Sequence, residues 1–288
     1  MTPALRLLDA GEVSALRSQA LYHGLAAGMK ETSEDTLVLC RPRETFFCVG
    51  YHQDADEELD TRFCGSNGYA ILHRRIGGGT VVLDRDQLFY QVILHASRAP
   101  LSVSAVYEKF LAAPVAALRA LSLPASLEGT NEIEVRGRRI AGTGGGRIGE
   151  AMVVTGNLLF DFPYGLMTRA WKAPSEAFRR LAGEALRASV TTLRQELETV
   201  PSMDDVKELL VREFRETLAR PVVKGSLTAL EKAAVRKAAA DLKEPSAEGP
   251  VVRAARVLKI ARGVYLRQEA DGPRVCESGH DSRAEARP

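Results

Sequence analysis

The spacing of apolar side chains predicts both helices and strands in the first part of the chain. Residues 9–29 carry apolar side chains at helix-like intervals, which predicts an opening helix with one buried face. Two short β-rich runs follow at residues 36–40 and 45–49, divided by a polar Arg-Pro-Arg break. Neighbouring runs of this kind are typical of a β-hairpin.

Glycines interrupt two later strand-like stretches. Residues 70–91 enter as an apolar run, pass through three glycines at 77–79 and leave as a β-branched run, which predicts a strand, a tight turn and a returning strand. Residues 130–162 repeat this plan, with five further glycines between residues 142 and 149. The segment between them, 102–121, carries apolar residues at helical spacing, which predicts a helix. Pro114 is expected to kink or divide that helix.

The last third of the chain has a different composition. Ser202 and Asp205 form a pattern typical of a helix capping box, and an amphipathic helix is predicted after it. A second, alanine-rich helix is predicted at 226–242, and short strands at 251–266. The polar segment 269–288 is expected to be disordered.

Composition narrows the classes of protein. The 288 residues are 45% apolar, which is ample for a core, and the net charge of +2 gives no reason to expect nucleic acid or a membrane as a partner. The four cysteines form no CxxC pair, so neither a disulfide framework nor a zinc site is expected. Without an apolar leader or an 18-residue apolar run, the chain is expected to be soluble and cytoplasmic.

Paired arginines accompany both glycine stretches. Arg74 and Arg75 precede the first group of glycines, and Arg138 and Arg139 precede the second. Glycine exposes backbone N–H groups to a ligand, so these stretches favour one anion held between two hairpins. The alternative is a loose glycine turn beside solvated arginines. Neither stretch is a P-loop or a GxGxxG motif that opens a helix, no GxSxG is present, and Cys64 is typical of an inert core cysteine.

The ordered set of motifs resembles the lipoate-protein ligase family of the biotin and lipoate ligase/transferase superfamily. The resemblance covers residues 5–198 and rests on GYHQ at 50–53, RRIGGGTVVLDRDQL at 74–88, TNEIEVRGRRIAG at 130–142, TGNLLFDF at 155–162, APSE at 173–176 and SVTTL at 189–193.

This resemblance implies an α+β fold with a central, mostly antiparallel sheet flanked by helices, and a small C-terminal α/β accessory domain. The expected units are a catalytic domain at 1–200, the accessory domain at 201–268 and the tail at 269–288. Family ligases use ATP and Mg²⁺ to form lipoyl-AMP or octanoyl-AMP, and then acylate one lysine of a lipoyl acceptor domain or of the glycine cleavage H protein.

Family site residues transfer to this chain by their motif positions. The implied ligand-binding residues are Arg74, Arg75, Gly77, Gly78, Gly79, Thr80, Asn131, Gly142, Thr143 and Asn157, and no metal ligand is assigned. The family's catalytic lysine falls on Arg139. Arginine keeps the charge but places it differently, so weakened ATP-dependent activation is expected.

Three other functions stay open. They are an acyltransferase that uses no ATP, a non-catalytic binder of lipoyl-AMP or of the acceptor, and a biotin ligase. A cysteine-based transferase is disfavoured, because no cysteine lies between Cys64 and Cys276. Thr155 and Asp84 are two further departures from the family's motifs, and they leave the acyl pocket and the metal region undefined.

Overall fold

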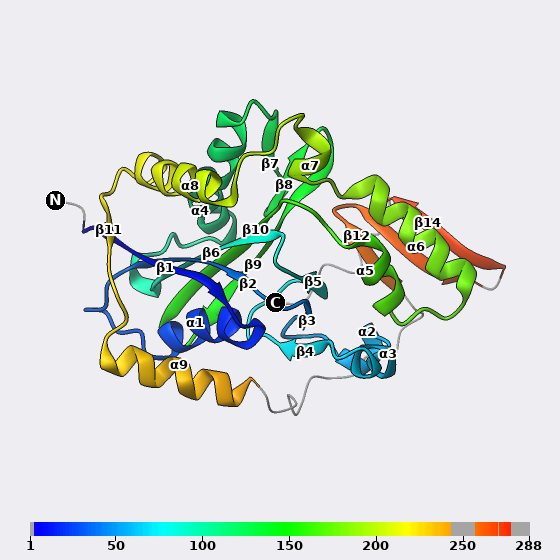
Figure 1. Cartoon of the computed structure of the whole chain (residues 1–288), viewed down its shortest axis with the longest axis horizontal. Coiled ribbons are helices and arrows are strands. Elements are labelled where there is room, and N and C mark those ends of the chain that lie inside the picture. Colours follow the sequence, from blue (N-terminus) through cyan, green and yellow to red (C-terminus); the bar gives the residue numbers. More distant parts are fainter. Residues whose placement is uncertain (1–2, 243–256, 270, 278–288) are drawn as a thin grey trace.

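The computed structural model describes residues 3–242, 257–269 and 271–277 (Figure 1). The strands are β1 (Leu5–Val13), β2 (Thr36–Pro42), β3 (Phe46–Val49), β4 (Ala70–His73), β5 (Val81–Leu83), β6 (Gln87–His95), β7 (Ala125–Glu128), β8 (Glu132–Val135), β9 (Arg138–Ile148), β10 (Ala151–Leu159), β11 (Val222–Lys224), β12 (Val257–Ala261), β13 (Val264–Glu269) and β14 (Gly272–Glu277). The helices are α1 (Ala15–Ala27), α2 (Ala55–Glu58), α3 (Thr61–Ser66), α4 (Val103–Ala120), α5 (Tyr164–Ala170), α6 (Glu176–Ser189), α7 (Leu193–Glu196), α8 (Met203–Thr217) and α9 (Ala229–Asp241), with a 3₁₀ turn at Ala96–Arg98.

A sheet of eight strands forms the centre of the protein, in the order β11-β1-β2-β6-β10-β9-β8-β7. Only the β11-β1 and β1-β2 pairs are parallel. Helices α4 and α8 cover one face, and α1 and α9 cover the other (Figure 1). The predicted α+β class, with a central mostly antiparallel sheet between helices, is therefore confirmed.

Strand β6 shows how sequence alternation builds both cores. Leu88, Tyr90 and Val92 point to the face under α4 and α8, whereas Phe89 and Ile93 point to the face under α1 and α9. All five are less than 5% exposed, so both faces of the central sheet are dry. Helix α4 runs through Pro114 without a break, so of the predicted kink or division the division is wrong.

The predicted hairpins at 36–49 and 70–91 are not formed. Strand β2 joins the large sheet, and β3 begins a separate three-stranded sheet in the order β4-β3-β5. Strand β4 pairs with β3 in parallel and β5 pairs with its other edge antiparallel, so the two strands of the first glycine stretch flank β3. The cause is the composition of β3, Phe-Phe-Cys-Val: all four side chains are buried, and a strand buried on both faces needs a partner at each edge.

The last described segments belong to two parts of the molecule. Helices α8 and α9 pack on the large sheet and strand β11 forms one of its edges, and the predicted capping box at Ser202 and Asp205 is confirmed. The predicted division at residue 200 therefore runs through this core, and as a boundary between independent domains it stays a prediction. The small C-terminal sheet β12-β13-β14 packs against α6.

The predicted disordered tail differs from the structure over residues 272–277. These residues form β14, because they pair in continuous antiparallel register with β13. Residues 270 and 278–288 of the tail, and 251–256 of the predicted strand region, lie outside the described residues. Among the described helices, none is both long and apolar enough to cross a membrane.

Candidate functional site

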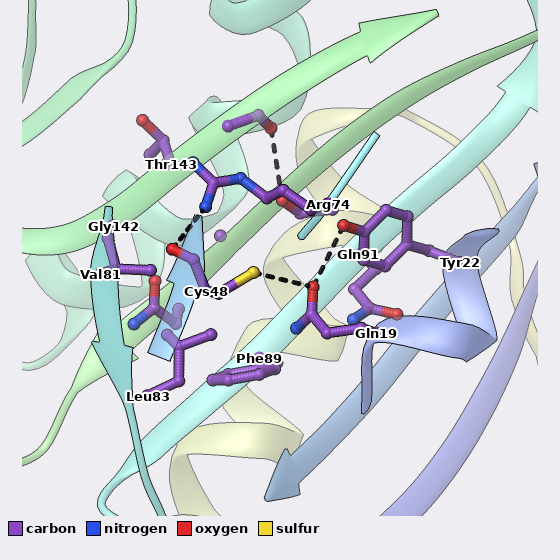
Figure 2. Close-up of a pocket in the computed structure, with 14 residues that line it drawn as sticks. Gln19, Tyr22, Cys48, Arg74, Val81, Leu83, Phe89, Gln91, Gly142 and Thr143 are labelled. Atoms are coloured by element: carbon purple, nitrogen blue, oxygen red, sulfur yellow. Dashed lines mark hydrogen bonds between the residues drawn. The ribbon is translucent and has the colours of Figure 1, made fainter. Parts of the chain in front are cut away.

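A pocket lies between α1, the small β4-β3-β5 sheet and the β9-β10 hairpin (Figure 2). It encloses about 480 Å³ of empty space, counting the part open to solvent. Its lining combines apolar side chains, bare glycine backbone and polar groups. The lining residues are Gln19, Tyr22, Cys48, Arg74, Val81, Leu83, Phe89, Gln91, Gly142, Thr143, Gly144, Thr155, Gly156 and Asn157.

Arg74 holds the first glycine stretch in a curled loop. Its guanidinium donates to the carbonyl oxygens of Cys48 at 3.1 Å, Gly77 at 3.2 Å and Gly79 at 2.7 Å, and the side chain is only 8% exposed. Gly78 has a φ of +102°, which glycine adopts without strain. Arg74 is therefore both a wall of the pocket and the support of its loop.

The curled loop also packs closely against two other backbones. A Cβ at Gly50, just after β3, would overlap the carbonyl oxygen of Gly78. The N–H of Gly77 donates to the carbonyl oxygen of Gly145 in β9 at 3.3 Å. The second group of glycines thus lies mostly inside a strand and not in a turn, where the absence of side chains lets the loop rest on the sheet.

Arg75 faces away from the pocket. Its side chain is 54% exposed and lies 3.7 Å from Asp241 of α9, while its N–H donates to Nε2 of His23 at 2.9 Å. The other ring nitrogen of His23 donates to the carbonyl oxygen of Gln19 at 2.8 Å. Burial lowers the pKa of His23 to about 4, so the ring is neutral and ties α1 to the arginine loop. An isolated histidine in a helix gave no signal of this role in the sequence.

The second pair of arginines is engaged by acidic side chains. Arg139 binds both carboxylate oxygens of Glu132 through Nε and Nη2. Arg138 and Arg136 both pair with Glu196, which follows from the position of α7 beside this hairpin. The structure thus does not gather the four arginines of the two pairs around one point, and of these only Arg74 lines the pocket.

The other residues implied by the motifs lie around the pocket or just behind it. Thr143 Oγ1 donates to the carbonyl oxygen of Asn131, and the Asn131 side chain hydrogen-bonds with Tyr107. Thr80 Oγ1 donates at 3.0 Å to Gln53 Oε1, which also accepts from the N–H of Gly50. Gly142, Thr143 and Asn157 line the pocket, whereas Thr80, Asn131 and the glycines at 77–79 belong to the shell around it.

Asn157 belongs to a chain of polar groups at the pocket edge. Its Nδ2 donates to Gln87 Oε1, and Gln87 Nε2 donates to the carbonyl oxygen of Val82 at 3.2 Å. Asp84 lies beside Gln87, and burial raises the pKa of its carboxyl to about 6. This carboxyl is thus partly protonated near neutral pH, an effect that the sequence pattern of Asp84 did not indicate.

Sequence analysis also missed the polar side chains contributed by α1 and its neighbours. Gln19, Tyr22 and Gln91 line the pocket, as does Cys48, whose pKa is raised by burial. Cys64 lies outside the pocket lining and is fully buried, with a pKa also raised by burial. Neither thiol is in the thiolate-favouring environment of a reactive cysteine.

The chemistry that this pocket can support follows from its lining. Val81, Leu83 and Phe89 suit an alkyl chain, and the glycine backbone with Arg74 suits an anionic or carbonyl head group. Within the described residues, no cluster of three or more His, Cys, Asp or Glu side chains is suited to hold a metal ion.

The comparisons with known proteins agree with this geometry. Residues 14–215 match the family described as lipoyl protein ligase A/B catalytic domain. The chain is 25% identical over 199 residues to lipoate-protein ligase A subunit 1 of Thermoplasma acidophilum, which covers 66% of this chain and 74% of that protein. It is 24% identical over 249 residues to an octanoyltransferase of Symbiobacterium thermophilum, with coverage of 78% and 90%.

A solved structure is similar over most of its length. It is the bi-partite lipoate protein ligase of Thermoplasma acidophilum, studied with its E2 lipoyl domain, and it superimposes with a TM-score of 0.76 at 23% identity, covering 83% of this chain and 92% of that one. The resemblance inferred from the motifs is thereby confirmed, and the chain belongs to the lipoyl protein ligase A/B catalytic domain family.

Proposed function

We propose that this protein transfers a lipoyl or octanoyl group to a lysine of an acceptor domain, through an acyl-adenylate bound in the pocket of Figure 2. One observation carries the proposal: a single pocket joins an apolar slot to bare glycine backbone and a buried arginine. The family's relatives, which are ligases and octanoyltransferases, support the same acyl group and the same kind of transfer.

Different residues of the pocket lining would bind different parts of such a ligand. Val81, Leu83 and Phe89 would contact the acyl chain and keep water away from it. Gly142 and Gly144 offer backbone without side chains beside Arg74, which suits the carbonyl and phosphate of an adenylate. Asn131, in the turn before β8, would act next to Thr143, and Arg139 would act from the start of β9.

ATP and Mg²⁺ are the expected co-reactant and cofactor. A lipoate-protein ligase A of similar fold binds ATP, and this supports ATP as the source of the adenylate here. The described residues offer no acidic cluster for a metal ion, so Mg²⁺ would be held mainly by the nucleotide phosphates and water, as is common for this ion. The metal would neutralise phosphate charge.

Arg139 limits how well the chain can activate a free acid. Two of its N–H groups are directed at Glu132, which leaves Nη1 and one hydrogen of Nη2 to reach a carboxylate or phosphate. This pairing favours a second candidate function, in which the chain transfers the acyl group from an adenylate made elsewhere and does not use ATP.

The acceptor is proposed from the chemistry of the relatives. The archaeal ligase was solved together with its E2 lipoyl domain, which supports a lipoyl acceptor domain as the partner. A glycine cleavage H-like protein is the other acceptor proposed, because the family resemblance implies it.

The experiment is an intact-mass measurement on a lipoyl acceptor domain. One reaction contains this protein, lipoate, ATP and Mg²⁺, and a parallel reaction contains preformed lipoyl-AMP. A mass gain of one lipoyl group in both reactions supports the complete ligase, and a gain with lipoyl-AMP alone supports the transferase. No gain in either reaction, with lipoate and with octanoate, contradicts the proposal.

A further inference from the structure

Gln19 presents a nearly unused amide nitrogen to the pocket. Its Oε1 accepts from the Tyr22 hydroxyl at 3.1 Å and from the Cys48 thiol at 3.7 Å, while its Nε2 has one long contact of 3.5 Å to Ser18 Oγ. The side chain is 4% exposed. Figure 2 shows the nitrogen turned away from Tyr22, on the side of the Phe89 ring.

The orientation of the Gln19 amide is fixed by its neighbours. Burial raises the pKa values of both Tyr22 and Cys48, so both groups keep their protons and donate to the oxygen. Gln91 lies on strand β6, and its Nε2 donates at 2.8 Å to the carbonyl oxygen of Ser18 in α1. This hydrogen bond fixes the backbone next to Gln19. The nitrogen of Gln19 is therefore held toward the pocket.

A second polar atom in the same pocket lacks a partner. Oε1 of Gln91 is fully buried and accepts no hydrogen bond from the described residues. The slot thus combines one underused donor, on Gln19, with one unpaired acceptor, on Gln91, among the apolar side chains of Leu83 and Phe89. A pure hydrocarbon chain would give neither group a further hydrogen-bond partner.

The two sides of the pocket differ in what they can bind. Gly142 and Thr143 lie on one side and Gln19 and Tyr22 on the other, with Cys48 between them (Figure 2). The Thr143 side adjoins Asn131, which directly precedes the β8-β9 hairpin that carries Arg139, so the carboxyl end of an acyl ligand belongs there. The distal end of the chain then lies beside Gln19.

We propose that Gln19 is a specificity-determining residue that selects acyl chains with a polarisable, hydrogen-bond-accepting distal group, such as a dithiolane, over plain alkyl chains of the same length. The inference rests on the proposed function, since it assigns the acyl end of that same site. Sulfur is a weak acceptor, so the expected preference is modest, about tenfold.

The test is calorimetric titration of the full chain with lipoate and with octanoate. The wild type is expected to bind lipoate about tenfold more tightly, and Gln19→Leu, which removes the donor at similar volume, is expected to bring the two affinities within about twofold. Equal affinities in the wild type, or a preference that survives in Gln19→Leu, overturn the role of Gln19. A wild type that binds neither acid overturns the assignment of this pocket to the acyl chain, whereas the proposed transfer itself is tested separately with lipoyl-AMP.

Two further variants separate selectivity from folding. Gln19→Met keeps an unbranched side chain without the amide. If the leucine variant fails to fold, the ratio of lipoate to octanoate affinity in the methionine variant tests the same prediction. Gln195→Leu is the matched control, because Gln195 donates to the Tyr164 hydroxyl and does not line the pocket. It is expected to keep the wild-type ratio of affinities, and an equal loss of the ratio in this control would overturn the inference.

Discussion

Arg139 and Glu132 form a two-point ion pair across the β8-β9 hairpin, in which Nε and Nη2 of the arginine reach the two oxygens of the carboxylate. Both side chains are largely buried, at 24% and 11% exposure. Such a planar, two-point pair fixes the guanidinium in one orientation. The cation at the position predicted for the family's catalytic lysine is therefore compensated and held in place.

Replacing Arg139 by lysine should raise the rate of lipoyl-AMP formation by roughly 100-fold, the lower end of the range associated with a well-placed donor. The ammonium of lysine is a point charge on a flexible stem and cannot hold both oxygens of Glu132 in a planar pair. Lipoate-dependent release of pyrophosphate from ATP measures this step.

The matched control for that substitution is Arg138→Lys. Arg138 pairs with Glu196 and does not line the pocket, so its replacement should leave pyrophosphate release within about twofold of the wild type. An Arg139→Lys variant that is folded but no faster than the wild type would show that the position of this cation does not limit activation.

Gly50→Ala should destabilise the pocket loop by about 3 kcal/mol or more, because the added Cβ meets the main chain of Gly78, which cannot rotate away. Gly79→Ala is the control for stability, since a Cβ there meets nothing within 4 Å. Urea unfolding should separate the two variants clearly. Similar losses of stability in both would mean that the loop does not depend on close approach at Gly50.

The motifs predicted the residues of the pocket better than they predicted the strands. Of the ten residues assigned to ligand binding, four line the pocket: Arg74, Gly142 and Asn157 fall in motifs, and Thr143 directly follows one. The pairing of β4 and β5 with β3 was missed, because short apolar runs predict strands but not their partners. Strand order depends on contacts that are distant in sequence.

Gln19 and His23 were missed for a different reason. Both lie in α1, where a polar residue on a buried helix has no local pattern to indicate what it faces. Their roles depend on β3, β6 and the arginine loop, which reach α1 only in the folded chain. The acidic partners of Arg138 and Arg139 could be predicted only in part: Glu132 is seven residues from Arg139, but Glu196 is 58 residues from Arg138.

Shortening the chain should show where its cooperative units end. Val206, Leu210 and Phe214 of α8 are fully buried in the core under α4, so a chain that ends at residue 200 should fail to fold. A chain that ends at residue 242 keeps α8, β11 and α9 and should unfold cooperatively, at a lower temperature because Phe178 and Leu186 of α6 lose their contacts with the small sheet. A folded chain of 200 residues would instead support the predicted domain boundary.

Asp84 and His23 should give stability profiles that slope in opposite directions with pH. Burial raises the pKa of Asp84 from near 3.8 to about 6, although the hydrogen bond from the N–H of Asp86 acts to lower it. Between these two pH values the folded chain therefore binds more protons than the unfolded chain. Stability from this group is therefore lost as the pH rises from about 4 to about 6. Burial lowers the pKa of His23 from 6.5 to about 4, with Arg75 and Arg74 adding to the shift, so stability from this group is lost as the pH falls through the same window.

Two substitutions should separate these contributions. Relative to the wild type, the free energy of unfolding of Asp84→Asn should rise by about 2–3 kcal/mol between pH 4 and pH 6.5, and that of His23→Gln should fall by a similar amount, since one pKa unit corresponds to about 1.4 kcal/mol. Urea unfolding at half-unit pH intervals measures both differences, and comparison with the wild type cancels the other carboxylates. A difference profile that is flat for Asp84→Asn would mean that Asp84 has the same pKa in the folded and the unfolded chain. A flat profile for His23→Gln would mean that the ring takes up a proton as easily when folded as when unfolded, which would contradict its assigned bond with the N–H of Arg75.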